Sequence, residues 1–277
     1  MVGYVYRVIH GGLGNQLFQI LSLYAYSKKY NLIPVIPQSK ESSSIFGNRP
    51  TYWDKLLSKI RIFNDLPEGI QQKICYKEPC FSYREIPSPQ SLGVLGDSFI
   101  IELSGYFQSE KYLENREEIL TLVKPLEKDI KYLEEKYRFL ITDQTCIIHI
   151  RRGDYLQLQH CHPIPPLSYY EMGIEMMKSQ GVDNFIILSD DITWVKEQNL
   201  FQGDKMKIVT EVSDYLEMWI FTYCRFFILA NSTFGWWGAW LSQKNDKRVI
   251  VPYQWFGPNG PQDYHSIWCE GWKAIKY

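Results

Sequence analysis

Hydrophobic residues recur along the first 36 positions in the periods of a strand, a helix and a second strand. The apolar run at 5–9 predicts a short buried strand, and apolar residues at helical spacing over 17–25 predict a helix. A second strand is predicted at 32–36. Because a glycine turn joins the first strand to the helix, this stretch predicts the opening of a parallel α/β unit.

The pattern weakens between residues 37 and 97, where Pro, Ser and Gly are frequent. We expect irregular structure there with one short helix at 53–60, and such a segment often carries a substrate surface. Beyond it the pattern predicts a strand at 99–103, a helix at 109–123 and, after Pro125, a helix at 126–139.

The second half of the chain alternates more regularly between apolar strands and helical segments. Its strands are predicted at 145–150, 184–188, 206–209, 225–229 and 248–251, with helices beginning near Ser168, Asp191, Asp214 and Ser232. Ser168 followed by Glu171 matches a capping box. Five apolar strands separated by helices predict a doubly wound parallel sheet. We therefore expect an N-terminal α/β domain at 1–140, with the irregular insert, and a C-terminal Rossmann-like domain at 141–277.

Charge and cysteine content exclude several classes of protein. The chain has 30 Lys and Arg against 31 Asp and Glu, so it has no overall field to attract a polyanion, and we expect no nucleic-acid partner. No apolar run reaches the about 20 residues that span a bilayer, so we expect no transmembrane segment. Six scattered cysteines without a CxxC pair indicate reduced thiols. A cytoplasmic protein, at most peripheral to a membrane, is expected.

Aromatic residues are unusually frequent, with 9 Trp, 20 Tyr and 14 Phe. Such a surplus indicates either a dense core or surfaces that stack on sugar-like ligands. We expect Trp236, Trp237 and Trp240 in the core. The candidates for sugar contact are Tyr52, Trp53, Trp255 and Trp268.

The first candidate site is the glycine turn at 10–16, HGGLGNQ, between the first strand and its helix. Glycines such as Gly12 and Gly14 let the backbone approach a ligand, and the helix N-terminus behind them favours an anion. The turn lacks the third glycine of a dinucleotide fingerprint, and the chain has no Walker pattern. A tight turn without a ligand is an equal alternative.

The second candidate site follows the first strand of the second half, where Arg151 and Arg152 lie in HIRRGDY. Guanidinium groups bind phosphate oxygens with two parallel hydrogen bonds, and the end of a parallel strand is where such sheets bind ligands. The alternative is a pair of arginines on a solvated loop. Asp154 is the nearest candidate base, but we favour a salt bridge from it to one arginine.

Two further segments follow strands in the second half. Asp190 and Asp191 either cap the next helix or accept hydrogen bonds from a guanine ring. Ser232 and Thr233 open another helix, as a plain N-cap or as a second anion site. Together these segments favour a nucleoside-diphosphate ligand over four independent caps.

Metal and cofactor binding have little support in the sequence. His160, Cys161 and His162 cluster on a loop, but no fourth ligand lies nearby in sequence. The chain also has no Asp-x-Asp motif, the pattern with which many metal-dependent sugar transferases hold a pyrophosphate. We expect no metal and no cofactor, with activity that survives EDTA.

These segments, in this order, resemble the alpha-1,2-fucosyltransferases of glycosyltransferase family 11. The matching stretches are GGLGNQLFQ (11–19), GYFQSEKYLE (105–114), HIRRGDY (149–155), ILSDD (187–191) and NSTFGWWGAWLS (231–242). The resemblance implies an α/β fold of GT-B type, with two facing Rossmann-type domains and a central cleft. It also implies GDP-L-fucose as donor, no metal, and inverting transfer to the 2-hydroxyl of a terminal galactose.

The resemblance also implies roles for individual residues. Arg151 matches the arginine that holds the donor pyrophosphate, and His149 with Asp190 or Asp191 matches the guanine contacts. Ser232 and Thr233 match the phosphate-binding turn, and Asn15 lies where the glycine loop meets the donor. We also assign Gly12, Gly14 and Arg152 to donor binding.

The acceptor is the least determined part of this prediction. The N-terminal domain is expected to be the acceptor side, and a galactose-terminated glycan, free or lipid-linked, is the expected partner. Another GDP-sugar transferase of different regiochemistry, or one with a protein acceptor, is a second hypothesis. A non-enzymatic, lectin-like module is a third, which leaves the arginine pair unexplained.

Overall fold

The computed structural model describes residues 2–44 and 47–277, and the chain forms two compact units. Unit 1 comprises Met1–Lys124 with His265–Ile267, and unit 2 comprises Pro125–Tyr264 with Trp268–Tyr277. The C-terminal segment joins unit 1 through the Tyr83 N–H, which donates to the Ser266 hydroxyl at 2.8 Å.

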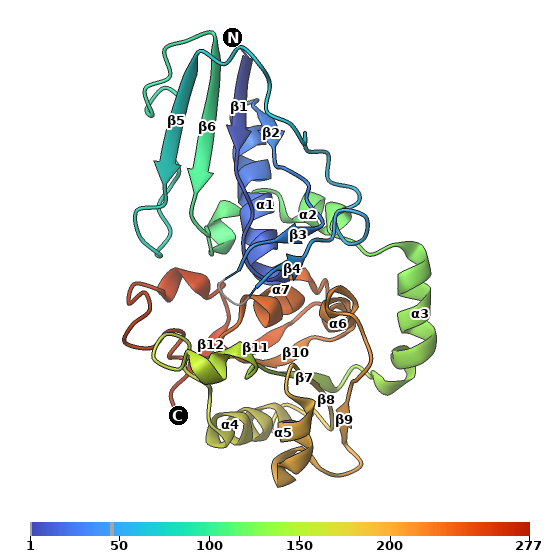
Figure 1. The fold of residues 1–277 in the computed structure, drawn as a ribbon. Coiled ribbons are helices and arrows are strands. Elements are labelled where there is room, and N and C mark those ends of the chain that lie inside the picture. Colours follow the sequence, from blue (N-terminus) through green and yellow to red (C-terminus); the bar gives the residue numbers. More distant parts are fainter. Residues whose placement is uncertain (1, 45–46) are drawn as a thin grey trace. The chain divides into compact units, whose positions relative to one another are not determined.

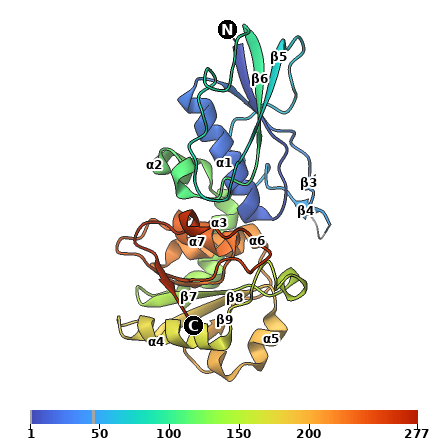
Figure 2. The same ribbon diagram turned by 90° about the vertical axis from the view of Figure 1, so that its left-hand side faces the viewer.

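Unit 1 is built on a parallel sheet of four strands in the order β2-β1-β6-β5. The strands are β1 (Val2–Tyr6), β2 (Ile33–Val35), β5 (Gln72–Lys77) and β6 (Ser98–Ser104). Helix α1 (Leu13–Lys29) covers one face of this sheet, as Figure 2 shows. The remaining elements of unit 1 are the two-stranded ribbon β3 (Glu41–Ser42) and β4 (Arg49–Pro50), helix α2 (Arg116–Leu122), and the 3₁₀ turns η1 (Glu110–Tyr112) and η6 (His265–Ile267).

Several predictions in unit 1 need correction. The first strand ends at Tyr6, because its extent is set by pairing with β6, which the apolar pattern at 5–9 does not report. The predicted helix at 53–60 is a series of turns in which the Tyr52 carbonyl accepts hydrogen bonds from both Lys55 and Leu57. The helix predicted at 109–123 is interrupted at Asn115, whose φ of 53° is left-handed and whose side chain caps α2.

Unit 2 contains a parallel sheet of six strands in the order β12-β11-β10-β7-β8-β9. The strands are β7 (Thr145–Ile150), β8 (Asn184–Ser189), β9 (Met206–Ile208), β10 (Phe226–Leu229), β11 (Arg248–Pro252) and β12 (Lys273–Ile275). The helices are α3 (Glu127–Tyr137), α4 (Leu167–Lys178), α5 (Ile192–Glu197), α6 (Asp214–Ile220) and α7 (Thr233–Leu241). Short 3₁₀ turns lie at η2 (Arg138–Leu140), η3 (Asp154–Gln157), η4 (Asn199–Phe201) and η5 (Phe221–Tyr223).

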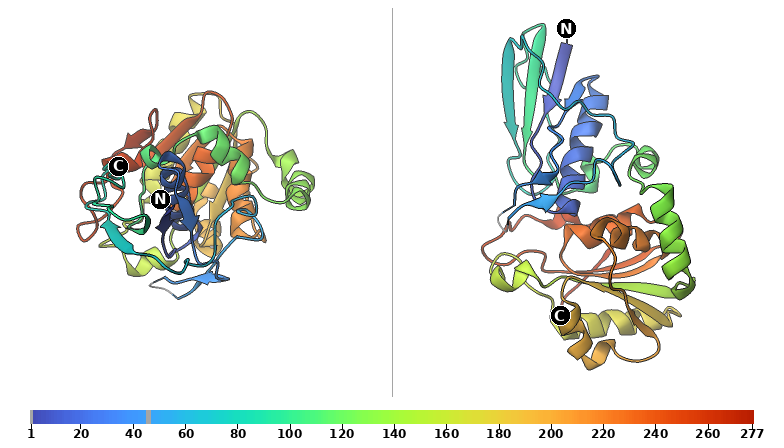
Figure 3. Two further views of the ribbon diagram at one scale, coloured as in Figure 1. Left: turned by 90° about the horizontal axis from the view of Figure 1, so that it is seen from above. Right: turned by 45° about the vertical axis from the view of Figure 1, so that its right-hand side comes forward.

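Helices cover both faces of the unit 2 sheet, with α4 and α5 on one face and α6 and α7 on the other (Figures 1 and 3). This confirms the predicted doubly wound parallel sheet, because the all-parallel strands are buried on both sides. The capping box at Ser168 is wrong, since α4 begins at Leu167 behind Pro166 and no side chain caps it.

The two units divide at Lys124, earlier in the chain than the boundary placed at residue 140. Helix α3 belongs to unit 2 because its side chains bond to the following elements. The Tyr137 hydroxyl donates to the Thr210 carbonyl at 3.0 Å, and the Tyr215 hydroxyl donates to Asp129 at 3.1 Å.

Most of the aromatic surplus lies in the core. Trp236 and Trp237 are fully buried and Trp240 nearly so, as predicted. Tyr52 and Trp255 are each 2% exposed, so the prediction that they contact sugar is wrong. Across the described residues, no helix combines the length and apolar character needed to cross a bilayer.

Candidate active site

The strand order of unit 2 reverses between its two central strands. From β7 the chain adds β8 and β9 on one side, then returns to place β10 on the other side of β7. Open α/β sheets bind ligands outside the carboxyl ends of their strands at such a reversal. The residues that follow β7 and β10, namely Arg151 and Asn231–Thr233, therefore lie where a ligand is expected.

Arg151 leaves the buried end of β7 and is held by two carboxylates. Its Nη2 lies 2.5 Å from Asp154 Oδ1, and its Nη1 lies 2.8 Å from Asp190 Oδ2. The guanidinium also packs over the ring of Tyr155, with 5.3 Å between Cζ and the ring centroid. Burial alone would lower the pKa of Arg151, but the negative charges of Asp190 and Asp154 outweigh this effect, so the pKa is raised overall. Its side chain keeps 26% exposure, so a fixed, charged guanidinium still reaches the surface.

Arg152 is bound into the protein more tightly than Arg151. Its Nε donates to Asp191 at 3.0 Å, and its guanidinium lies over the Trp194 ring, with 4.0 Å between Cζ and the ring centroid. Only 16% of its side chain is exposed. These contacts leave Arg152 less free to bind a ligand than the predicted arginine pair implies.

Asp190 and Asp191 perform different structural tasks. Asp190 accepts from the backbone N–H of Arg152 at 2.8 Å in addition to its pair with Arg151. Asp191 caps α5 by accepting from the Trp194 N–H at 3.1 Å, so the capping alternative is confirmed for this residue. Gly153 makes the arrangement possible, because a Cβ there would lie 2.5 Å from Asp190 Oδ2.

His149 is buried beneath this edge of the sheet as a neutral ring. Burial, aided by the charge of Arg151, lowers the pKa of His149 to about 3. The ring stacks on Phe234 with 5.5 Å between centroids, and Nδ1 has no hydrogen-bond partner. Gly235 permits this contact, since a Cβ there would lie 2.6 Å from His149 Nδ1.

Helix α7 begins beside this cluster. The Ser232 hydroxyl caps it by accepting from the Phe234 N–H at 3.3 Å, and Thr233 is its first residue. Tyr155 links the two segments, because its hydroxyl donates to the Asn231 carbonyl at 3.1 Å while its ring supports Arg151. The structure thus brings together His149, Arg151, Asp154, Asp190 and the start of α7.

The predicted glycine turn lies in unit 1. Gly11 has φ of +83°, and a Cβ there would lie 2.8 Å from Asn15 Nδ2. Gly12 is the residue before α1, and Gly14 is buried in its first turn. The side-chain oxygen of Asn15 accepts a hydrogen bond from Gln108 Nε2 at 3.0 Å, which orients its amide.

One histidine of the His160-Cys161-His162 loop has a packing role. His162 stacks on Tyr155, with 4.7 Å between ring centroids, and burial lowers its pKa. Over the part of the chain that the structure describes, no three His, Cys, Asp or Glu side chains gather in a way that could hold a metal ion.

Comparison with known proteins identifies the family. The sequence model described as Glycosyl transferase family 11 matches residues 81–276. This chain belongs to glycosyl transferase family 11. The O-antigen biosynthesis glycosyltransferase WbnK of Escherichia coli is 27% identical to this family 11 chain, over 92% of the chain and 96% of that protein. An alpha-1,2-colitosyltransferase of the same organism is 28% identical, over 89% of the chain and 90% of that protein.

Solved structures agree with this assignment at the level of fold. The crystal structure of POFUT1 in complex with GDP-fucose has a TM-score of 0.58 and 12% identity, covering 89% of this chain and 96% of that one. The GT-B-like α/β fold class is thereby confirmed. The family model and the sequence relatives confirm the resemblance to family 11. The chain is a glycosyltransferase.

Three residues of this family 11 site were not singled out from the sequence. The ring of Tyr155 packs against the Arg151 guanidinium, and the ring of Trp194 packs against that of Arg152. Both aromatic residues follow a matched motif residue closely in the sequence, Arg151 and Asp191, and this proximity could have indicated their role. Glu217 on α6 was also missed. Burial, together with Asp214 and Asp190, raises the pKa of Glu217 to about 8, which the sequence gives no means to foresee.

Proposed function

We propose that this family 11 chain transfers L-fucose from GDP-β-L-fucose to the 2-hydroxyl of a terminal galactoside, with inversion to an α-1,2 linkage. The observation that carries the proposal is the fixed guanidinium of Arg151 at the strand-order reversal of unit 2, next to the start of α7. The family supports fucosyl transfer, and the relative named as an alpha-1,2-colitosyltransferase supports the linkage.

In the proposed reaction the bond between fucose C1 and the β-phosphate oxygen breaks, and its electron pair stays on GDP. The acceptor oxygen attacks C1 from the opposite face, forms the new glycosidic bond and releases its proton to solvent water. Arg151 stabilises the charge that grows on the β-phosphate, and a preorganised donor of this kind is worth about 3–4 kcal/mol. Two N–H groups of the guanidinium are taken by Asp154 and Asp190, so the phosphate is bound by those that remain.

Asp154 is proposed to orient Arg151 instead of acting as the base. Its carboxylate lies 2.5 Å from Arg151 Nη2, and such a charge-assisted bond fixes the direction of the guanidinium. A strongly dissociative reaction needs little help from a base, because C1 is already positive when the hydroxyl attacks.

The rest of the donor is proposed to bind along the same edge. Ser232 and Thr233 at the start of α7 are assigned to the phosphates, and His149 with Asp190 or Asp191 to the guanine side. In unit 1, Gly12, Gly14 and Asn15 are assigned to the donor as well. Neutral His149 adds no positive charge to this site, so Arg151 is the main source of it, and Arg152 adds to it from its place beside Asp191.

A second candidate is transfer of colitose in place of fucose. It is favoured by one observation, the 28% identity to an alpha-1,2-colitosyltransferase over most of both chains. The two candidates share the site chemistry and differ in the donor sugar, so donor competition separates them.

The test is transfer from GDP-fucose to lactose, N-acetyllactosamine and lacto-N-biose, in buffer with EDTA. The expected result is one deoxyhexose added per GDP released, with an NMR spectrum that places an α linkage on O2 of galactose. A product linked elsewhere overturns the regiochemistry, and glycan binding without GDP release favours the lectin-like alternative. Loss of activity in EDTA that Mg²⁺ restores would overturn metal independence.

A further inference from the structure

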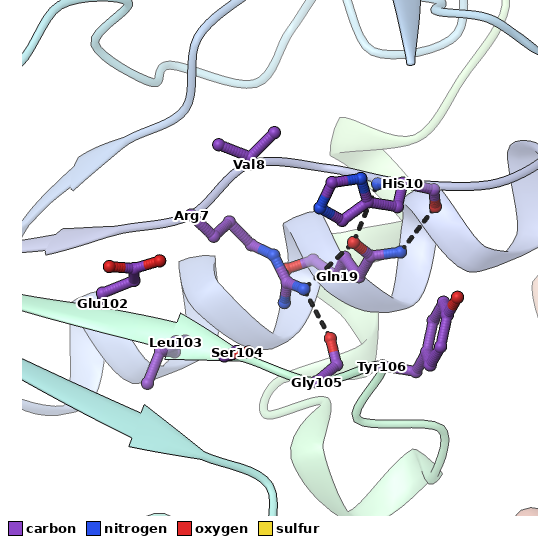
Figure 4. Close-up of a pocket in the computed structure, with 9 residues that line it drawn as sticks. All are labelled: Arg7, Val8, His10, Gln19, Glu102, Leu103, Ser104, Gly105 and Tyr106. Atoms are coloured by element: carbon purple, nitrogen blue, oxygen red, sulfur yellow. Dashed lines mark hydrogen bonds between the residues drawn. The ribbon is translucent and has the colours of Figure 1, made fainter. Parts of the chain in front are cut away.

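Unit 1 contains a pocket of about 270 Å³ at the carboxyl ends of β1 and β6 (Figure 4). Its polar lining includes Arg7, His10, Glu102, Ser104 and Tyr106. The strand order of unit 1 reverses between β1 and β6, because β2 lies on one side of β1 while β6 and β5 lie on the other. The pocket therefore occupies the position where an open α/β sheet binds a ligand.

Arg7 is the unusual residue of this pocket, because it is charged and only 2% exposed. It donates from Nη1 to the Gln19 carbonyl at 3.1 Å and from Nη2 to the Gly105 carbonyl at 2.6 Å, both uncharged acceptors. Its Nε is buried and has no hydrogen-bond partner. Burial lowers the pKa of Arg7 to about 9, although Glu78 opposes the shift. Arginine is rarely buried without a carboxylate partner, so an orphan donor here requires an explanation.

Gln19 of α1 fixes this part of the pocket. Its side-chain oxygen accepts from Arg7 Nη2 at 3.0 Å and from the His10 N–H at 3.1 Å, while its amide nitrogen donates to the His10 carbonyl at 2.8 Å. Figure 4 shows this network behind the Arg7 guanidinium, with Glu102 on one side and Tyr106 on the other. The polar wall is thus held in place before any ligand binds.

The charges of the lining select the class of ligand. A carboxylate or phosphate in the pocket would be repelled by the negative charge of Glu102, and a cation would be repelled by the positive charge of Arg7. Neither kind of ion is therefore attracted by both residues. An uncharged polyol suits both, because its hydroxyls donate to Glu102 and accept from Arg7. Tyr106 is 45% exposed, and its ring offers a flat apolar surface of the kind that stacks on a sugar ring.

The size of the pocket agrees with one sugar ring. Pockets for drug-sized ligands span about 300–1,000 Å³. At about 270 Å³ this one lies just below that range, so it suits a single pyranose better than a sugar nucleotide.

We infer that this pocket binds one uncharged hexopyranose of the acceptor glycan, with Glu102 and Tyr106 as specificity-determining residues and Arg7 as the fixed donor beneath them. The inference rests on the proposed function only in identifying the bound sugar as part of the acceptor. Binding of the sugar to unit 1 stands or fails by itself.

The test is saturation-transfer NMR without any donor, using methyl β-D-galactopyranoside, methyl β-D-glucopyranoside and glucuronate as probes. We expect saturation transfer to at least one neutral glycoside and a weaker effect for glucuronate. Glu102→Gln replaces charge-assisted hydrogen bonds by weaker neutral ones, and we expect it to weaken binding about tenfold. Loss of stacking in Tyr106→Ala weakens it about two- to twelvefold. Both side chains are exposed, so the variants are expected to fold, and Tyr132→Ala on α3 is the matched control that binds as the unmodified protein does.

Three outcomes would overturn the inference: no saturation transfer to either neutral glycoside, preferential binding of glucuronate, or unchanged binding in both pocket variants. A parallel assay of fucose transfer tells the two proposals apart. Sugar binding that depends on Glu102 and Tyr106, in a protein that transfers no fucose, leaves the pocket standing and removes the proposed function. Transfer that proceeds with acceptor KM unchanged in both variants leaves the proposed function standing and overturns the assignment of the pocket to the acceptor.

Discussion

At the scale of single residues, the site is defined by how Arg151 is held. Two carboxylates and an aromatic ring fix its guanidinium in one direction. Arg152 has equivalent supports in Asp191 and Trp194, but its lower exposure indicates a structural role. A lysine has one charged nitrogen in place of a planar fork and cannot reproduce either arrangement.

Arg151→Lys is expected to lower kcat by about 10²–10³, because a transition-state hydrogen-bond donor of the oxyanion-hole type is lost. Steady-state kinetics with GDP-fucose and lactose measure this. Arg248→Lys, at an exposed position at the start of β11, is the control and should leave kcat unchanged. Near-normal turnover in Arg151→Lys would remove Arg151 from the donor site.

Asp154→Asn distinguishes orientation from base catalysis. If Asp154 orients Arg151, kcat falls by about tenfold or more through loss of a charge-assisted bond, and the pH profile keeps its shape. If Asp154 were instead the general base, its removal would abolish the fall of kcat at acidic pH. Measurement of kcat from pH 5 to pH 9 decides between them, and a vanished acidic limb contradicts the orienting role.

At the scale of elements, helix α7 approaches its neighbours closely at two glycines. Gly235 lets the helix meet the His149 ring, which is itself stacked on Phe234. Gly238 does the same one turn later, where a Cβ would lie 2.4 Å from the Phe221 ring. Gly235 thus sets the approach of α7 to the end of β7, and Gly238 sets its approach to η5.

Gly235→Ala is expected to destabilise unit 2 by about 1–3 kcal/mol, since the added methyl overpacks a site whose ring cannot move aside. Gly12→Ala is the matched control for stability, because a Cβ there meets no atom within 4 Å. Urea unfolding of both variants measures the difference. Equal stability of the two would show that α7 adjusts to the methyl group.

At the scale of the whole molecule, each unit carries its candidate site at the strand-order reversal of its own parallel sheet. The site of unit 2 is rich in charge, and the pocket of unit 1 is lined by a more neutral mixture. The titration of buried groups around the unit 2 site then affects the stability of the protein as pH changes.

Glu217 is expected to make the protein less stable as pH rises from 6.5 to 8. Its pKa is about 8 in the folded chain against an ordinary 4.5, so the folded state holds a proton that the unfolded state has released. The free energy of unfolding therefore falls by up to about 1.4 kcal/mol per pH unit. Burial lowers the pKa of His149 to about 3 and also lowers the pKa of His162, so these two residues have the opposite effect mainly below their ordinary value of 6.5, and Glu217 dominates this window.

Denaturant unfolding at several pH values measures this effect. Glu217→Gln should flatten the curve between pH 6.5 and pH 8, while Glu135→Gln on the exposed face of α3 should leave it unchanged. A curve with the same slope in Glu217→Gln would assign the pH dependence to another group.

The sequence by itself determined the alternation of strands and helices in unit 2, the motifs at the strand ends and, through those motifs, the family. This was possible because buried parallel strands are continuous apolar runs, and site residues follow them directly. The edge strand β5, QKICYK, was missed because none of its residues is fully buried and its two lysines leave an apolar run of only three residues.

Only the tertiary structure decided the pairing of charges and the pocket in unit 1. Arg151, Asp154 and Asp190 meet because β7 and β8 are neighbours in the sheet, a contact between segments that no local pattern reports. Arg7 lies in the middle of the segment 5–9 that was predicted as a strand, and it gave no signal of a pocket. Its burial follows from the return of β6 beside β1 almost 100 residues later, which brings Gly105 to its guanidinium.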